Sequence, residues 1–249
     1  MKAEILYGFH PVYEALKAGR RTFHEVYISN QTPTGRIKRI ASVAAAKALP
    51  IKEIGPAKLQ SIAGTVSHQG VAARTSAYPL VDVADIIEAA ISGDRPPLLL
   101  LLDHIVDPHN LGAIIRTALC AGVDAVIIPK DRSAYPSPAV SKVSAGALEY
   151  MRVAQVNNIV RVVRMLKDRD LWIVGLDQNA GQSVYNSDLA GAIALVIGGE
   201  EKGIRSLVKR NCDFLISIPQ AGKIGSLNAS VAGAIVMYEA YRQRNVRNN

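Results

Sequence analysis

Six apolar stretches in the second part of the chain constrain its fold more than any other feature of the sequence. Apolar runs without polar alternation are typical of strands buried on both faces, and helices between them indicate a parallel sheet covered on both sides. The strands are expected at residues 98–102, 124–128, 152–156, 171–176, 193–197 and 214–218. Helices are expected at residues 111–121, 140–148, 159–169, 204–210 and 229–244. The sequence therefore predicts an α/β domain that begins near Leu98.

The first 76 residues follow a different pattern, in which short helices and strands alternate. Pro11 suits the first turn of a helix that Gly19 ends. Further helices are expected at 36–49 and 58–63, and strands at 23–29, 51–54 and 70–75. The next stretch holds Pro79, a short helix and a run containing Gly and Pro, which is typical of a domain boundary. We therefore predict a small domain at 1–76, a linker at 77–97 and a larger domain at 98–249.

The charge balance favours a polyanionic partner. Lys and Arg total 29 against 21 acidic residues, a net charge of +8, and a positive field attracts and holds phosphates. A basic surface that serves only solubility would explain the same number. Aromatic residues make up 5% of the chain, too few to support a sheet that stacks bases. Contact with RNA would therefore depend on Arg and Lys and on flat side chains such as Tyr135.

The cysteines, the apolar runs and the histidines bound the remaining possibilities. Two cysteines, Cys120 and Cys212, do not indicate a disulfide framework, so a reduced, cytoplasmic protein is expected. The start of the chain lacks the apolar core of a signal peptide, and the longest apolar run is too short to span a bilayer. The five histidines lack ligand spacing with the cysteines, so no metal site and no membrane partner are expected. Only His109 is a candidate proton carrier, and a simple polar role in a loop explains it as well.

Polar residues follow the first expected strand of the larger domain, at the edge where an open parallel sheet binds its ligands. Asn110 can cap the N-terminus of the next helix. Arg116 lies further along that helix among apolar residues, and a charged side chain in such a place needs a partner. Either an acidic residue of the protein or an RNA phosphate or ribose would meet that need.

Two more loops follow expected strands of the same sheet. Gly198 and Gly199 precede Glu200, and glycines directly after a buried strand allow a ligand to approach the backbone. The spacing matches neither a dinucleotide fingerprint nor a phosphate-binding P-loop, and an ordinary turn would explain it. The loop from Pro219 is rich in small and polar residues, which suits a pocket lined by backbone, and Asn228 can cap the last helix.

Taken together, these segments resemble the three motifs of the SpoU (TrmH-like) branch of the SPOUT methyltransferases, in the right order. The matching residues are Asn110-Leu111-Gly112 with Arg116, then Ile197-Gly198-Gly199-Glu200, then Ile218-Pro219-Gln220 and Ser226-Leu227-Asn228-Ala229-Ser230-Val231-Ala232. The resemblance covers about residues 98–244. The segments at 7–12 and 69–73 are similar to the L30e-like substrate-binding domain that such enzymes often carry. Within the branch, the chain looks most like the bacterial enzymes that methylate a guanosine ribose in 23S ribosomal RNA.

The resemblance implies an α/β fold whose C-terminal part forms a deep trefoil knot, a homodimer, and S-adenosylmethionine as the cofactor. It implies Asn110, Arg116, Glu200, Ser226 and Asn228 as catalytic residues. It implies cofactor binding at Gly198, Ile218 and Leu227, with a further loop near Leu176. An arginine stays protonated in proteins, so Arg116 is expected to hold an RNA phosphate or the ribose hydroxyl rather than to act as a base.

The implied reaction is methyl transfer to the ribose 2′-hydroxyl of a guanosine in 23S ribosomal RNA. Two alternatives stay open. The substrate could be transfer RNA or a ribosomal site linked to antibiotic resistance, or the protein could be a non-catalytic RNA-binding protein associated with the ribosome. No motif position is degenerate, which favours catalysis.

Overall fold

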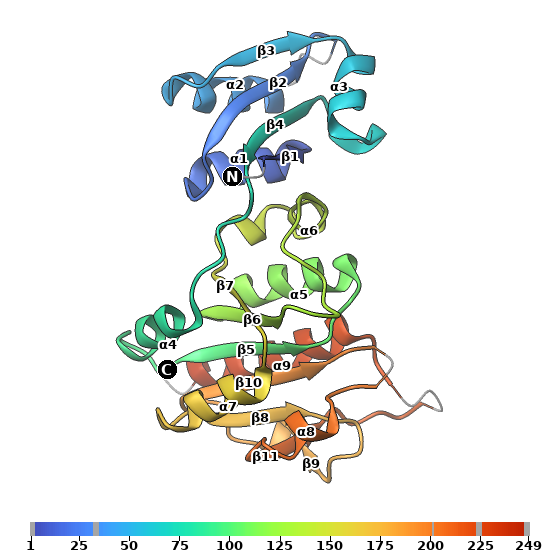
Figure 1. Cartoon of the computed structure of the whole chain (residues 1–249). Coiled ribbons are helices and arrows are strands. Elements are labelled where there is room, and N and C mark those ends of the chain that lie inside the picture. Colours follow the sequence, from blue (N-terminus) through green and yellow to red (C-terminus); the bar gives the residue numbers. More distant parts are fainter. Residues whose placement is uncertain (1–2, 32–34, 201, 223–225, 247–249) are drawn as a thin grey trace. The chain divides into compact units, whose positions relative to one another are not determined.

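The computed structural model describes residues 3–31, 35–200, 202–222 and 226–246 (Figure 1). The chain forms two compact units, each made of more than one segment. The first comprises Met1–Pro79 and Pro136–Tyr150, and the second comprises Leu80–Tyr135 and Met151–Asn249. In the described residues, no helix combines the length and the apolar composition needed to cross a membrane.

The first unit is built on a four-stranded sheet in the order β1-β4-β2-β3, in which only β2 and β3 run parallel. Its strands are β1 (Ala3–Tyr7), β2 (Phe23–Ser29), β3 (Ile51–Ile54) and β4 (Val71–Ser76). Its helices are α1 (Phe9–Ala18), α2 (Gly35–Ala46), α3 (Pro56–Ala63) and α6 (Pro138–Val143), with 3-10 turns at Val66–His68 and Ala147–Glu149. Gly19 ends α1 in a left-handed conformation, with φ of 66°, as predicted. The core of this unit includes Leu6, Val12 and Ile40.

A buried ion pair holds the segment Pro136–Tyr150 in the first unit. Arg21 donates from Nε and Nη2 to the carboxylate of Glu149 at 2.7 and 3.1 Å, and the Ser141 hydroxyl donates to the same carboxylate at 2.8 Å. The side chains of Arg21 and Glu149 are 0% and 1% exposed. The domain limits expected from the sequence assign this segment to the larger domain, whereas its contacts group it with the N-terminal sheet.

The second unit contains a seven-stranded sheet in the order β7-β6-β5-β10-β8-β11-β9, and all its strand pairs are parallel. The strands are β5 (Leu98–Asp103), β6 (Ala125–Pro129), β7 (Val153–Val156), β8 (Trp172–Leu176), β9 (Gln182–Ser183), β10 (Ile193–Gly198) and β11 (Phe214–Ser217). The helices are α4 (Val83–Ile91), α5 (Pro108–Cys120), α7 (Ile159–Lys167), α8 (Ser206–Lys209) and α9 (Ala229–Val246), with a 3-10 turn at Val184–Asn186. The predicted parallel α/β fold is confirmed.

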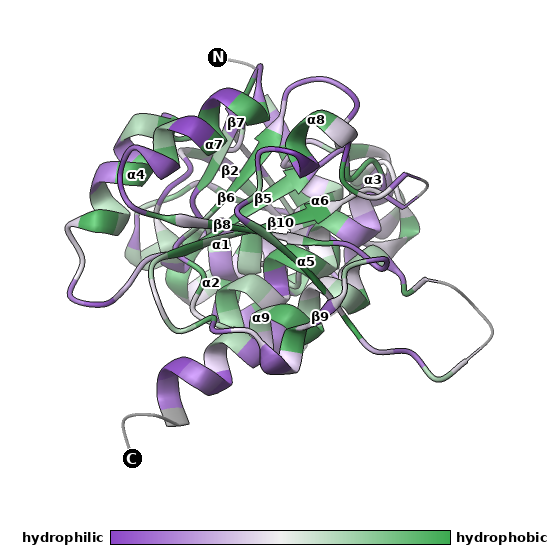
Figure 2. Ribbon diagram, turned by 90° about the horizontal axis from the view of Figure 1, so that it is seen from below, coloured by the Kyte–Doolittle hydropathy of each residue, from purple (hydrophilic) through white to green (hydrophobic). Residues whose placement is uncertain are grey.

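Helices cover both faces of this sheet, as its apolar strands require. Figure 2 shows α4, α7 and α8 on one side of the strands and α5 and α9 on the other. Every residue from Leu98 to Leu102 is fully buried, because the side chains of β5 alternate between the two covered faces. Leu99 and Leu101 belong to a core that includes Ile86 and Val163 from the first of these helix layers.

The first helix after β5 starts earlier than the sequence predicts. Asp107 caps α5, since its carboxylate accepts the N–H of His109 at 2.8 Å, and Pro108 occupies the first turn. The predicted capping role of Asn110 is therefore wrong, and its side chain is left for other contacts. The prediction for Asn228 is confirmed, because its Oδ1 accepts the N–H of Ser230 at 2.9 Å where α9 begins.

The order of the strands creates a switch point at the centre of the sheet. From β5 the chain adds β6 and then β7 on one side, whereas β8 and β11 lie beyond β10 on the other side. The carboxyl ends of β5 and β10 are level, because Gly198 pairs with Asp103. Open α/β sheets bind ligands at such points, so the loops after β5, β8, β10 and β11 are the place to look for a site.

Candidate active site

A pocket of about 280 Å³ opens at the carboxyl ends of β8, β10 and β11. The loop after β8 contributes Leu176 to Asn179, and the loop after β10 contributes residues from Ile197 to Gly203. The long segment between β11 and α9 contributes Ile218, Gln220, Ser226 and Leu227, and α9 adds Ala229 and Ala232. Lys223, Ile224 and Gly225 of the third motif, like Glu201, lie outside the described residues.

The residues expected to bind the cofactor surround this pocket. Gly198, Ile218 and Leu227 all line it, as do Glu200 and Ser226 from the expected catalytic set. Apolar side chains of Ile197, Ile218 and Leu227 form part of the lining, and polar side chains including Asp177, Gln178 and Glu200 form another part. An apolar surface with a few polar groups is typical of sites for small organic ligands.

The two glycines after β10 serve the packing of the chain itself. A Cβ on Gly198 would overlap with the backbone of Gly203 and Ile204, and one on Gly199 would meet the carbonyl oxygen of His104. Gly199 and Gly203 also form an isolated antiparallel bridge. The glycines are therefore needed because backbone passes close to backbone, which is a different reason from the close approach of a ligand that the sequence suggested.

Side chains from all three motifs form one hydrogen-bonded chain. Asn110, which is 8% exposed, donates from Nδ2 to Oε1 of Glu200 at 2.6 Å and accepts from Nδ2 of Asn228 at 3.0 Å. Oδ1 of Asn228 in turn accepts from the hydroxyl of Ser230 at 2.6 Å. The amide of Asn110 therefore has a fixed orientation, because its donor and its acceptor are both engaged. The structure brings these residues together although 90 and 118 positions separate Asn110 from its two partners.

Asp103 is a positioning residue that the sequence reasoning missed. Its fully buried carboxylate accepts the backbone N–H and the Nε–H of Arg205, both at 2.8 Å, and lies 2.9 Å from Nδ1 of His104. These bonds tie the end of β5 to the segment after the pocket-lining Gly203. The available signal was a carboxylate directly after a run of five leucines, since a buried charge requires partners.

A second ion pair steadies the loop after β8. Nζ of Lys209 in α8 lies 2.6 Å from the Asp177 carboxylate, which also accepts the N–H of Asn179 at 2.9 Å. Burial alone would raise the pKa of Asp177, but the bonds from Lys209 and from the backbone outweigh it, so this pKa is lowered. Asp177 therefore stays charged at the edge of the pocket.

Arg116 stands apart from the other expected site residues. It is exposed on α5 and is not among the residues that line the pocket. Within the described part of the chain it makes no hydrogen bond or ion pair with another residue. The alternative in which an acidic residue neutralises a buried Arg116 is therefore wrong, because helix α5 turns this side chain outward.

Comparisons with known proteins agree with this geometry. The model of the SpoU rRNA Methylase family matches residues 97–238, and the model described as RNA 2′-O ribose methyltransferase substrate binding matches residues 5–81. The chain is 42% identical to the 23S rRNA (guanosine-2′-O-)-methyltransferase RlmB of Ralstonia nicotianae over 98% of each chain. It is 39% identical to RlmB of Escherichia coli K12, over 97% of this chain and 99% of that protein. It is 40% identical to the putative TrmH family tRNA/rRNA methyltransferase YacO of Bacillus subtilis, over 96% and 95%.

Solved structures share the fold at lower identity. The SpoU methyltransferase AviRb of Streptomyces viridochromogenes superposes with a TM-score of 0.82 at 24% identity, covering 98% of this chain and 91% of that one. The same enzyme in complex with its cofactor AdoMet gives a TM-score of 0.80, covering 96% and 89%. The two family matches and the identities to curated relatives over nearly the full length lead to one conclusion. The chain belongs to the SpoU family of rRNA methylases.

Proposed function

We propose that this protein transfers a methyl group from S-adenosylmethionine to the ribose 2′-hydroxyl of a guanosine in 23S ribosomal RNA. Relatives named for this reaction are 38–42% identical over nearly the whole chain. The observation that carries the proposal is the chain Glu200–Asn110–Asn228, which joins all three motifs beside the pocket. A turn that only connected strand to helix would not need a buried amide with both of its ends engaged.

The pocket suits S-adenosylmethionine in shape and in chemistry. Its apolar side chains, Ile197, Ile218 and Leu227, offer a surface for a flat purine. Two carboxylates, Asp177 and Glu200, lie in its lining and complement a ligand that carries positive charge. When bound, this cofactor supplies an electrophilic methyl group on a positively charged sulfur.

The protein's own residues position the ribose. A hydroxyl has to be held in line with the methyl group, and such orientation supplies much of the rate of a bimolecular reaction. Asn110 is rigid because Glu200 and Asn228 hold its amide, so we assign the two partners to its orientation. Ser226 lines the pocket beside them and is assigned to the ribose or to the loop. The expected knot stays a prediction that follows from the family.

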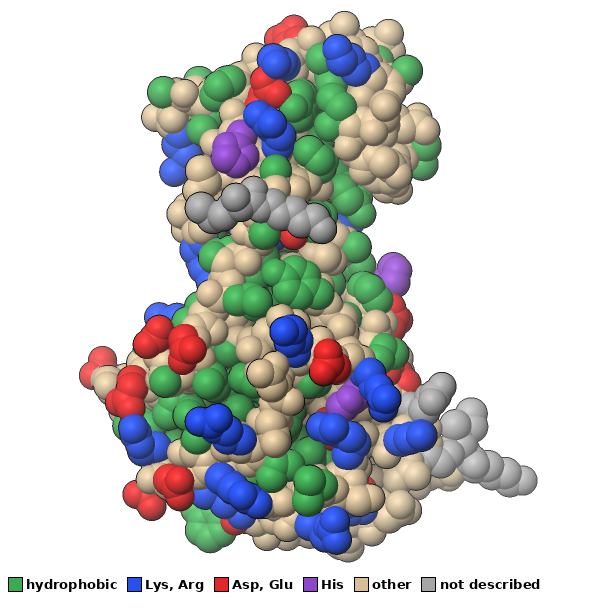
Figure 3. Space-filling view, viewed as in Figure 1, with side chains coloured by type: hydrophobic (Ala, Val, Ile, Leu, Met, Phe, Trp, Pro, Cys, Tyr) green, Lys and Arg blue, Asp and Glu red, His purple; other side chains and the backbone are tan. Residues whose placement is uncertain are grey.

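Arg116 is assigned to the RNA. Its exposed guanidinium has no partner in the described residues, and a planar fork of donors matches a phosphate or a developing oxyanion. Lys and Arg side chains also lie across the face of the second unit seen in Figure 3, around α7 and α8, which suits a polyanionic substrate.

A homodimer is part of the proposal. Three apolar or aromatic side chains on one helix, Val231, Tyr238 and Tyr241 of α9, are exposed, and the two tyrosine rings lie 5.9 Å apart. Leu119 is exposed on α5, which packs against α9. Exposed apolar patches on single chains commonly mark interfaces. Sedimentation of the purified protein should give twice the mass of one chain, and a monomer at micromolar concentration would contradict the dimer.

Two measurements test the reaction. Calorimetry with S-adenosylmethionine should show binding, whereas a non-catalytic RNA-binding protein should give no heat. Incubation with unmethylated transcripts of 23S rRNA and of transfer RNA, followed by mapping of 2′-O-methyl groups, should place one mark on a guanosine of the 23S transcript. A mark on transfer RNA alone would favour the second substrate class. The activity should survive a chelator, in line with the expected absence of a metal and with a cytoplasmic enzyme that needs only its cofactor.

A further inference from the structure

Three cationic side chains gather around two stacked aromatic rings in the first unit. The rings of Phe9 and Tyr13 on α1 lie 5.3 Å apart and nearly parallel. From α2, the guanidinium of Arg36 lies 5.6 Å from the centre of the Phe9 ring, and that of Arg39 lies 4.9 Å from the centre of the Tyr13 ring. Nζ of Lys17 lies 5.6 Å from the same Tyr13 ring. We call these five residues the α1–α2 cluster.

Acidic residues do not balance this charge within the two helices. All residues of α1 and α2 are described, and they contain Lys17, Arg36, Lys38 and Arg39 against a single carboxylate, that of Glu14. Glu14 accepts a hydrogen bond from the hydroxyl of Tyr150 at 2.8 Å. Arg36, Arg39 and Lys17 are all exposed. Three cations therefore repel one another at close range, and an anion between them would relieve that repulsion.

The geometry of the arginines indicates which anion fits. A guanidinium that lies over an aromatic ring has lost much of its freedom, and its edge still presents N–H donors in a fork. Arg39 spends one donor on the Tyr13 hydroxyl, at 3.0 Å, and keeps others. Such a fork matches the oxygens of a phosphate. His10, exposed on the same helix with its ring 5.0 Å from that of Phe9, adds a flat side chain on which a base could stack.

We propose that the α1–α2 cluster grips the phosphate backbone of the RNA substrate through Arg36 and Arg39. This inference rests on the proposed function for the identity of the RNA, and it names the surface of the first unit that would hold it. RNA is favoured over an acidic protein because two pre-oriented forks beside flat rings match phosphates and bases together.

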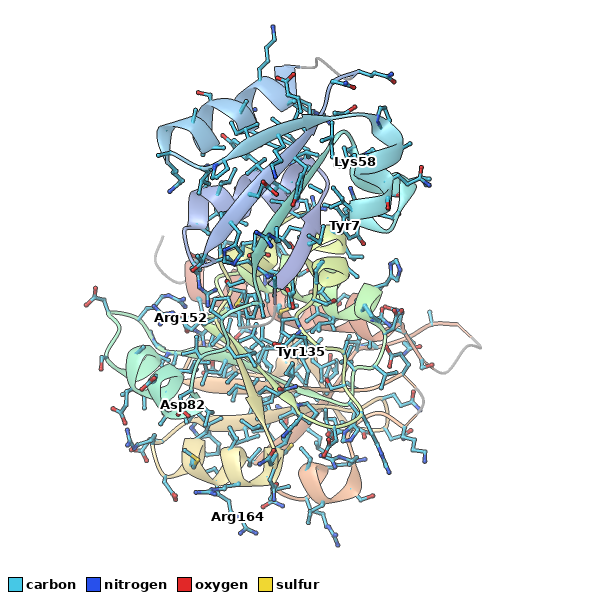
Figure 4. All side chains as sticks on the ribbon, turned by 45° about the horizontal axis from the view of Figure 1, so that its top comes forward. Tyr7, Lys58, Asp82, Tyr135, Arg152 and Arg164 are labelled. Atoms are coloured by element: carbon cyan, nitrogen blue, oxygen red, sulfur yellow. The ribbon has the colours of Figure 1, made fainter. Side chains whose placement is uncertain are left out.

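The test compares two double variants of the full chain. In Arg36→Gln/Arg39→Gln both forks are lost, while Phe9 and Tyr13 stay. In the control, Lys47→Gln/Lys58→Gln removes two exposed lysines of the same unit, at the end of α2 and on α3 (Figure 4). Binding to an unmethylated 23S rRNA transcript is measured on filters over a series of salt concentrations.

The arginine variant should bind this transcript about 10²-fold more weakly, at about tenfold for each charge-assisted contact. Its dependence of log K on log salt should flatten by about 1.5, because two phosphate contacts no longer release counterions. The control should stay within about twofold of the wild type. The melting temperature of the arginine variant should be unchanged or higher, since removing like charges relieves repulsion, and its KM for RNA should rise while its affinity for S-adenosylmethionine is constant.

Equal affinity and equal salt dependence in the wild type and the arginine variant would overturn the inference, and so would an equal loss in the control. Tighter binding of a polyglutamate peptide than of the transcript, lost in the arginine variant, would assign the cluster to an acidic protein instead. These outcomes are independent of catalysis, because failure of the wild type to methylate the transcript would refute the proposed function while the filter assay still decides the surface.

Discussion

Removal of one buried carboxylate should unfold part of the molecule and leave the pocket intact. Glu149→Gln keeps the size of the side chain but removes the charge that faces Arg21. Arg21 is fully buried and also bonds Glu4 at 2.8 Å and the carbonyl oxygen of Ser76 at 3.1 Å. Burial alone would lower the pKa of Arg21, but the bonds to Glu149 and Glu4 raise it, so the guanidinium stays charged in the variant.

The size of the effect follows from what is left behind. Breaking a buried pair by removing one partner typically costs 3–5 kcal/mol, because the other charge stays buried. Glu4 still neutralises part of the charge here, so we expect the low end, about 3 kcal/mol. For a domain of under 100 residues, that corresponds to a fall in melting temperature of about 12 °C or more. The loss should be confined to the first unit, because all the groups that bond Glu149 belong to it.

Calorimetric melting with and without S-adenosylmethionine measures this. The transition that the cofactor does not shift should move down in Glu149→Gln, and cofactor affinity at 25 °C should be unchanged. Glu53→Gln, an exposed residue of β3, is the matched control and should melt like the wild type. A truncation that starts near Asp94 lacks Arg21, so its segment 136–150 should be cleaved rapidly by protease. A variant that melts within 2 °C of the wild type would refute the assignment of the ion pair to the stability of this unit.

Three further predictions concern the second unit. Leu227→Glu should abolish calorimetric binding of S-adenosylmethionine while circular dichroism stays native, because a carboxylate enters the apolar part of the pocket; unchanged affinity would remove Leu227 from the cofactor site. Asn110→Asp should lower turnover more than Asn110→Ala, because two carboxylates would meet where Nδ2 now lies 2.6 Å from Glu200; equal rates would show that this bond is not needed. Arg116→Ala should reduce turnover by about 10² to 10³ with little change in melting temperature, and Arg116→Lys should fail as well if the fork matters; a large fall in melting temperature would assign Arg116 to the fold.

The central strands were predictable because burial on both faces leaves a plain signal. Five consecutive leucines in β5 need no alternation, and the ends of β10 and β11 were placed within one residue. The strands that the sequence did not reveal are β1 and β9, which lie at the edges of the two sheets. An edge strand is covered less, so its pattern of apolar residues is weaker: β1 has an exposed first residue, and β9 is only two residues long.

The site was predictable as a set of motifs but not as a set of contacts. An asparagine near the start of a helix reads as a cap, and Asn228 is one. Asn110 reads the same way, yet Asp107 takes the cap because Pro108 fixes the first turn, so Asn110 is free to bond residues that lie far along the chain. Local pattern could not separate the two cases, since the difference depends on which strand ends are neighbours in the sheet.

Glu149 shows the same limit at the level of the domains. In sequence it lies in a stretch that reads as a helix of the larger domain, where a glutamate normally faces water. Its partner, Arg21, is 128 positions away, and the pair is buried. The chain therefore passes between the two units at 79/80, 135/136 and 150/151, so neither unit is one uninterrupted stretch of sequence. An exchange of the front domain between relatives should succeed only if residues 136–150 are exchanged with it, because the arginine and the glutamate have to come from the same parent.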